Sequence, residues 1–165
     1  MKIKKLFEMQ KELDSHIINE HKLEGKNLVP EKIVAFIVEL GELANEIRFF
    51  KFWSSKPKSH PNIILEEYVD GVHFLLSLGL DIGANQIVED DFKIDLITLD
   101  NLTDEFIYII SLAIELRKHS TYENYRNLLN RYLSLAYTLG FTEEQIIRAY
   151  LSKNIINHKR QEQGY

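Results

Sequence analysis

The strongest restriction on the fold comes from residues 62–80, NIILEEYVDGVHFLLSLGL, which would be apolar around most of a helix. A helix that is apolar nearly all round is a buried helix. Glycine and proline are scarce, at 7 and 3 of 165 residues, and this favours long helices over many short strands. The sequence therefore predicts an all-α bundle in which this segment is buried.

Apolar residues at helical spacing predict six helices with short connections. Their approximate ranges are residues 3–22, 30–47, 62–78, 101–118, 121–139 and 142–161. Pro30 suits the start of the second helix, Gly79 is expected to end the third, and Thr142 has the capping-box spacing to Gln145. Residues 80–101 fit either a short strand or a loosely packed connection. With no internal repeat or linker, residues 1–165 are expected to form one domain.

Charge and composition exclude several classes of protein. Twenty basic and 25 acidic residues give a net charge of −5, which argues against a nucleic-acid partner. The absence of cysteine excludes disulfides, thiolate zinc sites and a cysteine nucleophile, and it suits a reducing compartment. No uncharged apolar run reaches the roughly 18 residues of a membrane span, and the N-terminus lacks the apolar region of a signal peptide. We therefore expect a globular, cytoplasmic protein with no membrane partner.

Two of the predicted helices carry acids on faces that border or enter the core. At about 100° per residue, Glu39, Glu42 and Glu46 share one narrow face beside the apolar stripe of their helix. The buried helix also has one polar stripe, which comprises Glu66, Glu67, Asp70, His73 and Ser77. Charged groups are rarely buried without a partner, because uncompensated burial is costly. The polar stripe therefore requires a compensating group.

These helices each present a pair of acids three residues apart, Glu39 with Glu42 and Glu67 with Asp70. If the helices pack antiparallel, the four carboxylates converge, and a cation between them relieves their repulsion. Ligands that are all oxygen select hard cations, so the expected ion is Mg²⁺, with Mn²⁺ as a second choice. Gly41, inside the helix that carries Glu39 and Glu42, predicts the close approach of a neighbouring element.

Two other hypotheses fit the same acids. In the first, a buried carboxylate network tied to Arg48 or Lys51 belongs to a helical interaction protein that is not an enzyme. In the second, the acids form a di-iron or di-manganese centre. Such centres use Glu-x-x-His on two helices, whereas this chain offers an imidazole only in Asp70-x-x-His73.

The last predicted helix concentrates hydrogen-bond donors. Lys153, Asn157 and Arg160 follow one another at spacings of four and three residues, so they share one helix face. In a chain of negative net charge, such a face predicts phosphate recognition. Lys51 and Lys56, in the loop after the first acid pair, would add positive potential.

The arrangement of these motifs carries a family resemblance. The Glu39-x-x-Glu42 and Glu67-x-x-Asp70 pairs are separated by residues 43–66, with FKFWS between them and DGVHF starting at Asp70. On these residues the chain resembles the dimeric, all-α dUTPases, a branch of the MazG-like nucleoside triphosphate pyrophosphohydrolases. The resemblance implies that dUTP is cleaved to dUMP and pyrophosphate with Mg²⁺ held by the four acids. It also implies a homodimer, and the dimeric branch tends to act on dUDP as well.

The resemblance further implies roles for individual residues. Glu42, together with Glu39, would orient or deprotonate the attacking water. Glu46 would support these acids without binding the metal itself. The residues expected to bind the base and sugar are Gln10, Asp14, Trp53 and His73, although relatives carry Asn where this chain has Asp14. The residues expected around the triphosphate are Lys153, Asn154, Asn157 and Arg160. Tyr165 is expected to close over the substrate.

The resemblance leaves two points open. A relative that hydrolyses another nucleotide, such as dCTP or a damaged dNTP, would share the metal-binding acids and differ in the residues around the base. The apolar stretches 106–116 and 128–139 could each supply either a dimer interface or core.

Overall fold

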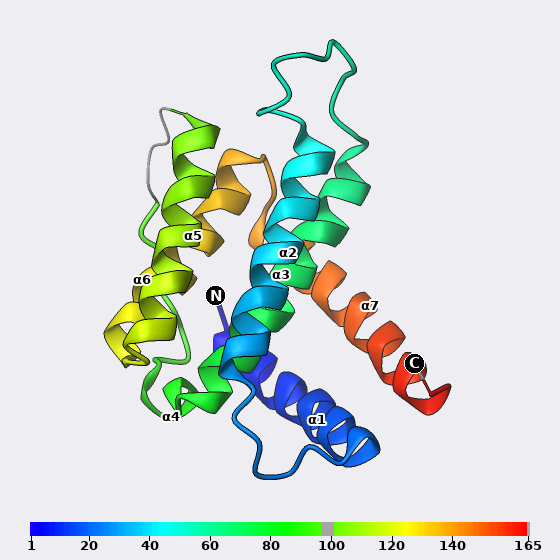
Figure 1. Cartoon of the computed structure of the whole chain (residues 1–165), viewed down its shortest axis with the longest axis vertical. Coiled ribbons are helices and arrows are strands. Elements are labelled where there is room, and N and C mark those ends of the chain that lie inside the picture. Colours follow the sequence, from blue (N-terminus) through cyan, green and yellow to red (C-terminus); the bar gives the residue numbers. More distant parts are fainter. Residues whose placement is uncertain (97–100, 165) are drawn as a thin grey trace.

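The computed structural model describes residues 1–96 and 101–164 (Figure 1). Their helices are α1 (Ile3–His21), α2 (Val29–Ile47), α3 (Pro61–Asp81), α4 (Ala84–Ile87), α5 (Leu102–Lys118), α6 (Tyr122–Thr138) and α7 (Glu143–Glu162). These residues contain no β-strand, and a single isolated bridge pairs Lys2 with Asp91. The prediction of an all-α bundle is confirmed.

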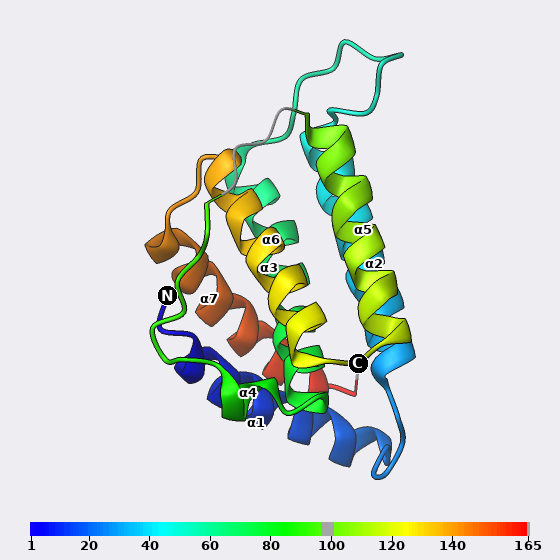
Figure 2. The same cartoon turned by 90° about the vertical axis from the view of Figure 1, so that its left-hand side faces the viewer.

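Helix α3 is the central element of the bundle. It contacts α1, α2, α4, α6 and α7, and Figure 1 shows it antiparallel to α2. Eleven of its residues are buried, as expected for a segment that is apolar around most of its surface. The α5–α6 hairpin covers one side, with α5 alongside α2 (Figure 2), and α1 and α7 cover the other.

Helix boundaries follow the local signals in most places. Helix α3 begins with Pro61, and the His60 ring accepts a hydrogen bond from the Asn62 amide. Helix α7 begins with the expected capping box, in which the Thr142 hydroxyl and the Gln145 side chain each accept from the other residue's amide. Residues 80–101, which fitted a strand or a connection, include the short helix α4.

Two glycines have roles that differ from the prediction. Helix α3 does not end at Gly79 but continues to Asp81. A Cβ at Gly79 would lie 2.5 Å from the Tyr125 hydroxyl and 2.8 Å from the Phe7 ring. This glycine lets α6 and α1 pack tightly on α3. For Gly41 the prediction of a close neighbour is wrong, since nothing within the described residues lies within 4 Å of its Cβ position.

Aromatic residues fix α6 against α3. The rings of Tyr68 and Tyr132 stack 4.8 Å apart, and each hydroxyl donates to the other residue's backbone oxygen, at 3.1 and 2.8 Å. Both side chains are fully buried. Tyr132 also occupies the space where a Cβ of Gly71 would lie. This packing holds the middle of α3, the part that carries its acids, in a fixed position.

Within the described residues, none of the helices has the combined length and apolarity that crossing a membrane requires.

Candidate active site

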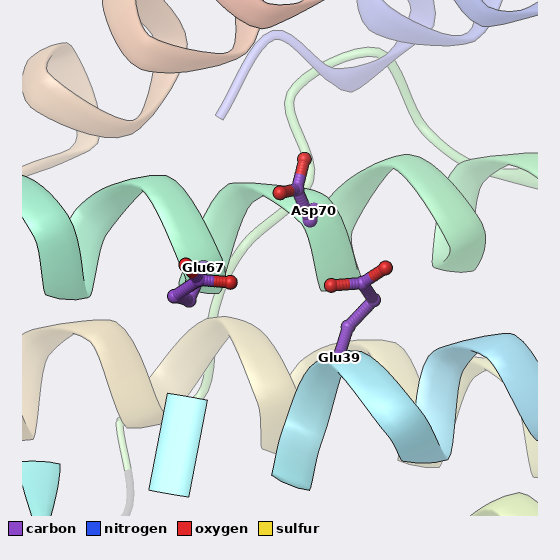
Figure 3. A group of neighbouring side chains, drawn as sticks. All are labelled: Glu39, Glu67 and Asp70. Carbon is purple, nitrogen blue, oxygen red and sulfur yellow. The ribbon is translucent and has the colours of Figure 1, made fainter. Parts of the chain in front are cut away.

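Three carboxylates converge where α2 packs against α3 (Figure 3). Glu39 projects from α2, while Glu67 and Asp70 project from α3, and one oxygen atom of each lies within 4.8 Å of the others. The antiparallel packing of the two helices brings together three of the four acids that were expected to converge. The fourth acid, Glu42, is exposed and does not belong to this group of three.

Burial and mutual repulsion make this carboxylate group electrostatically strained. Burial, followed by the charges of Asp70, Glu42 and Glu67, raises the pKa of Glu39 to about 7. Burial and the charge of Asp70 also raise the pKa of Glu67. A cation placed among these oxygens would relieve the repulsion, and oxygen donors suit a hard divalent ion. The group therefore fits a divalent metal.

One cation of the chain already contacts the carboxylates. Lys153 of α7 is buried, and its ammonium lies 2.7 Å from Asp70 Oδ2 and 3.1 Å from Glu66 Oε1. Although burial lowers the pKa of Lys153, its hydrogen bonds to Asp70 and Glu66 raise it above its ordinary value. Burial raises the pKa of Asp70, more than Lys153 lowers it.

The cations proposed for a purely structural network lie elsewhere. Arg48 donates to the Ser54 hydroxyl at 2.9 Å and to the Lys56 carbonyl at 3.1 Å. The Lys51 ammonium lies 5.5 Å from the centre of the Phe50 ring. Both side chains therefore organise the loop between α2 and α3, and the prediction that they tie the carboxylates together is wrong.

A cavity of about 490 Å³ adjoins the carboxylate group, between α1, α2, α3 and α7. Its lining includes seven of the residues that the sequence marks as functional: Gln10, Asp14, Glu39, Asp70, His73, Asn157 and Arg160. Its apolar wall includes Leu13, Ile17, Leu28 and Phe74. The volume lies within the range of pockets that hold small molecules, and apolar walls with a few convergent polar groups are typical of such pockets.

A buried hydrogen-bond network fixes the side chains at the back of the cavity. Gln10 Oε1 lies 2.9 Å from both the Tyr150 hydroxyl and His73 Nδ1. Since a carbonyl oxygen only accepts, His73 donates from Nδ1, and its Nε2 atom is left as an acceptor. That Nε2 is buried and has no hydrogen-bond partner among the described residues.

His73 is held in its neutral form. Burial and the nearby charge of Lys153 lower the pKa of His73 to about 3. Its ring stacks on Tyr150, with ring centres 4.2 Å apart. A neutral imidazole with a bare, buried nitrogen is suited to receive a hydrogen bond from a ligand.

Asp14 lies at the same side of the cavity. Its carboxylate accepts hydrogen bonds from the Gln10 amide at 2.7 Å and from the Ser77 hydroxyl at 2.5 Å. The ammonium of Lys32 lies 3.6 Å from Asp14 Oδ2 and 2.7 Å from Asp81 Oδ2. Asp14 is therefore the acceptor at the centre of a polar cluster.

Trp53 and Glu42, which the sequence marks as functional, do not line the cavity. Trp53 lies in the loop between α2 and α3, is 65% exposed and packs edge to face on Phe52 and Phe50. Figure 1 shows this loop projecting beyond the ends of both helices. Glu42 lines a groove between α2 and α5 instead. Tyr165 lies outside the described residues.

Sequence reasoning missed three residues of this site, Lys32, Phe74 and Tyr150. Each shares a helix face with a predicted residue: Lys32 is seven before Glu39, Phe74 is four after Asp70, and Tyr150 is three before Lys153. A search one or two helical turns along the same helix face from each predicted residue would have found them.

A family model described as dUTPase matches residues 2–165. The comparison with curated proteins finds no match. The family match favours a hydrolase over the interaction protein and over the di-iron or di-manganese centre, and favours dUTP over another nucleotide. It spans nearly the whole chain, so the chain belongs to the all-α dUTPase family and acts as a dUTP diphosphatase.

Proposed function

We propose that dUTP binds in the cavity between α1, α2, α3 and α7, with its phosphates at the carboxylate group. One observation carries this proposal: Glu39 and Asp70 belong both to the three converging carboxylates and to the cavity lining. A ligand in the cavity would therefore contact any ion that these carboxylates hold.

The residues that would hold Mg²⁺, or Mn²⁺ in its place, are Glu39, Glu67 and Asp70, with Glu42 beside them. When bound, such an ion supplies neutralisation of phosphate charge and a lower pKa for the attacking water. Glu42 is exposed, and its charge contributes to the raised pKa of both Glu39 and Glu67, which supports a role for it next to these acids. We assign it the role of orienting the water and accepting its proton, with Glu39 in support.

The donors on α7 would bind the phosphates. Asn157 and Arg160 line the cavity, and Lys153 lies beside Asp70 at its edge. An amide, a guanidinium and an ammonium on one helix face can donate to several phosphate oxygens at once. The charges of Lys153 and Arg160 also offset the excess of acids at this end of the cavity.

The base and sugar would lie toward the hydrogen-bond network at the back of the cavity. His73 Nε2 needs a donor, and both the sugar hydroxyl and the uracil N–H are donors. Gln10 and Asp14 supply further polar groups on the same side. The roles of Trp53 and Tyr165 stay predictions.

We also propose that the protein is a homodimer built on the outer faces of α2 and α5. Four apolar residues there are strongly exposed: Val34, Val38, Ile107 and Ile114, at 62%, 50%, 61% and 43%. Of the two stretches considered for an interface, residues 128–139 are mostly buried in the core, whereas 106–116 contribute Ile107 and Ile114 to this face. Exposed apolar patches of this kind mark interaction sites.

Three further expectations stay predictions. One is activity on dUDP, and another is the cytoplasmic location. The third is a single domain over residues 1–165, which is supported by one hydrophobic core with members from every helix.

The test is pyrophosphate release from a panel of dNTPs with and without Mg²⁺. Glu42→Gln should bind nucleotide but turn over little, and Glu39→Gln and Asp70→Asn should lose both Mg²⁺ response and turnover. Glu12→Gln, on an exposed face of α1, is the matched control for removing a carboxylate. Normal turnover by Glu39→Gln and Asp70→Asn would contradict the proposed site.

A further inference from the structure

The cavity has two polar ends that lie two helical turns apart. Glu39 and Asp70 form one end, and Lys32 and Ser77 line the other. On α2 and on α3 alike, the two ends are seven residues apart, which corresponds to about 10.5 Å along a helix and nearly the same face. Because α2 and α3 run antiparallel, both helices place their second polar residue in the same direction. A nucleotide with its phosphates at the first end would direct its base toward the second.

Lys32 is the cation of this second end. Its side chain is only 13% exposed, and its ammonium contacts Asp81 at 2.7 Å and Asp14 at 3.6 Å. An ammonium carries three N–H groups, so one N–H remains after one has been directed to Asp81 and one to Asp14. Since Lys32 lines the cavity, its ammonium can donate to a ligand bound there.

Asp14 supplies the complementary chemistry. An ionised carboxylate only accepts hydrogen bonds. The uracil edge presents N3–H next to the 4-carbonyl oxygen, and it therefore needs one acceptor and one donor side by side. Asp14 alone can satisfy only the first of these, and Lys32 lies directly beside it.

We infer that Asp14 and Lys32 together recognise uracil, with Asp14 accepting from N3–H and Lys32 donating to the 4-carbonyl oxygen. The inference rests on the proposed dUTP site. Cytosine carries a bare N3 and a 4-amino group, so a lone pair would face the carboxylate and an amino group would face the ammonium. Both contacts would be mismatched, and a site built to pair a polar edge rejects such an analogue. Lys32 is therefore a specificity-determining residue.

The test compares kcat/KM for dUTP and dCTP in Lys32→Met and in Asp81→Asn. Both variants break the Lys32–Asp81 ion pair, but only Lys32→Met removes the donor that faces the cavity. Lys32→Met should lower the ratio of dUTP to dCTP kcat/KM by about 10- to 100-fold, the effect of one hydrogen bond from a charged donor. Asp81→Asn should keep the wild-type ratio of dUTP to dCTP kcat/KM. Its melting temperature should fall by about as much as that of Lys32→Met, because both variants lose the same ion pair.

A rescue variant covers the case in which Lys32→Met folds poorly, since that change leaves two carboxylates without their cation. In Lys32→Met/Asp14→Asn, the asparagine amide restores one acceptor and one donor and removes one of those charges. We expect this double variant to regain the preference for dUTP. The inference is overturned if Lys32→Met keeps the wild-type ratio, or if the double variant folds and shows no regained preference. Failure of the site itself would show separately, as normal turnover by Glu39→Gln.

Discussion

The ammonium of Lys153 lies 2.7 Å from Asp70 Oδ2, so a cation from α7 contacts one of the three carboxylates that converge between α2 and α3. The same ammonium also contacts Glu66, at 3.1 Å. Asp70 is thus shared between a lysine that could serve a phosphate and a group that could hold a metal. The two functions are therefore electrostatically coupled, and a change at Lys153 should affect both.

Lys153→Met is expected to raise KM for dUTP by about 10- to 100-fold, the cost of one charge-assisted hydrogen bond. Without nucleotide, the same variant should bind Mg²⁺ more tightly, because Asp70 loses its competing cation. Steady-state kinetics and a Mg²⁺ titration followed by thermal melting would measure the two effects. Lys159→Met, an exposed lysine of the same helix, is the control. Weaker Mg²⁺ binding by Lys153→Met would contradict the coupling.

The raised pKa of Glu39 predicts how the metal-free protein responds to pH. The folded state holds this proton up to about pH 7, whereas the unfolded chain releases it near 4.5. Between these values the folded state binds more protons, so stability falls as pH rises through this range. Mg²⁺ should reverse the loss above pH 7, because it binds the deprotonated carboxylate.

Glu39→Gln separates this effect from other sources of pH dependence, since glutamine is neutral throughout. With a chelator at pH 8, the variant should melt at or above the temperature of the wild type. With Mg²⁺ at pH 8, the wild type should gain stability and the variant should gain less. Equal gains from Mg²⁺ in the two proteins would count against a metal at this group, and Glu12→Gln should behave as wild type.

Sequence reasoning could predict Glu39 and Asp70 as neighbours for a physical reason. The helical period fixes which face each residue occupies, and antiparallel packing of two consecutive helices then brings their acid-bearing faces together. The pairing of Lys153 with Asp70 depends instead on where α7 crosses α3, which no local pattern encodes. The same is true of Lys32 with Asp14, which lie on α2 and α1. Trp53 lies in a loop, where helical spacing predicts no position.

The glycines also show that contacts between distant segments cannot be predicted from a local pattern. Glycine lowers helix propensity wherever it occurs, so the pattern alone favoured an end at Gly79 and a close neighbour at Gly41. In the structure the close neighbours, Tyr125 and Phe7, lie at Gly79 instead. Which glycine serves packing is decided by large side chains from distant segments, and these contacts are visible only in the folded chain.

His73 offers a direct test of the network at the back of the cavity. Its lowered pKa, about 3, predicts that the ring stays neutral from pH 8 down to about pH 4 in the folded protein. Its unfolded counterpart takes up a proton near 6.5, so stability should fall as pH drops below that value. Nitrogen-detected NMR should find the proton on Nδ1 and none on Nε2. Titration of His73 near pH 6.5, or a proton on Nε2, would contradict the network.

The exposed face of α2 and α5 makes a final prediction about assembly. If two copies bury this face, a lysine in place of Ile107 must either be buried without a partner or prevent the contact, and burial of an unpaired charge is strongly unfavourable. Ile107→Lys should therefore be monomeric in light scattering at concentrations where the wild type is a dimer. Ile155→Lys, on α7, is the matched control, because Ile155 is 57% exposed and Ile107 is 61% exposed. The two variants add the same charge. If both remain dimers, the interface lies elsewhere. If only Ile155→Lys becomes monomeric, the interface lies on α7 and the proposed face is wrong.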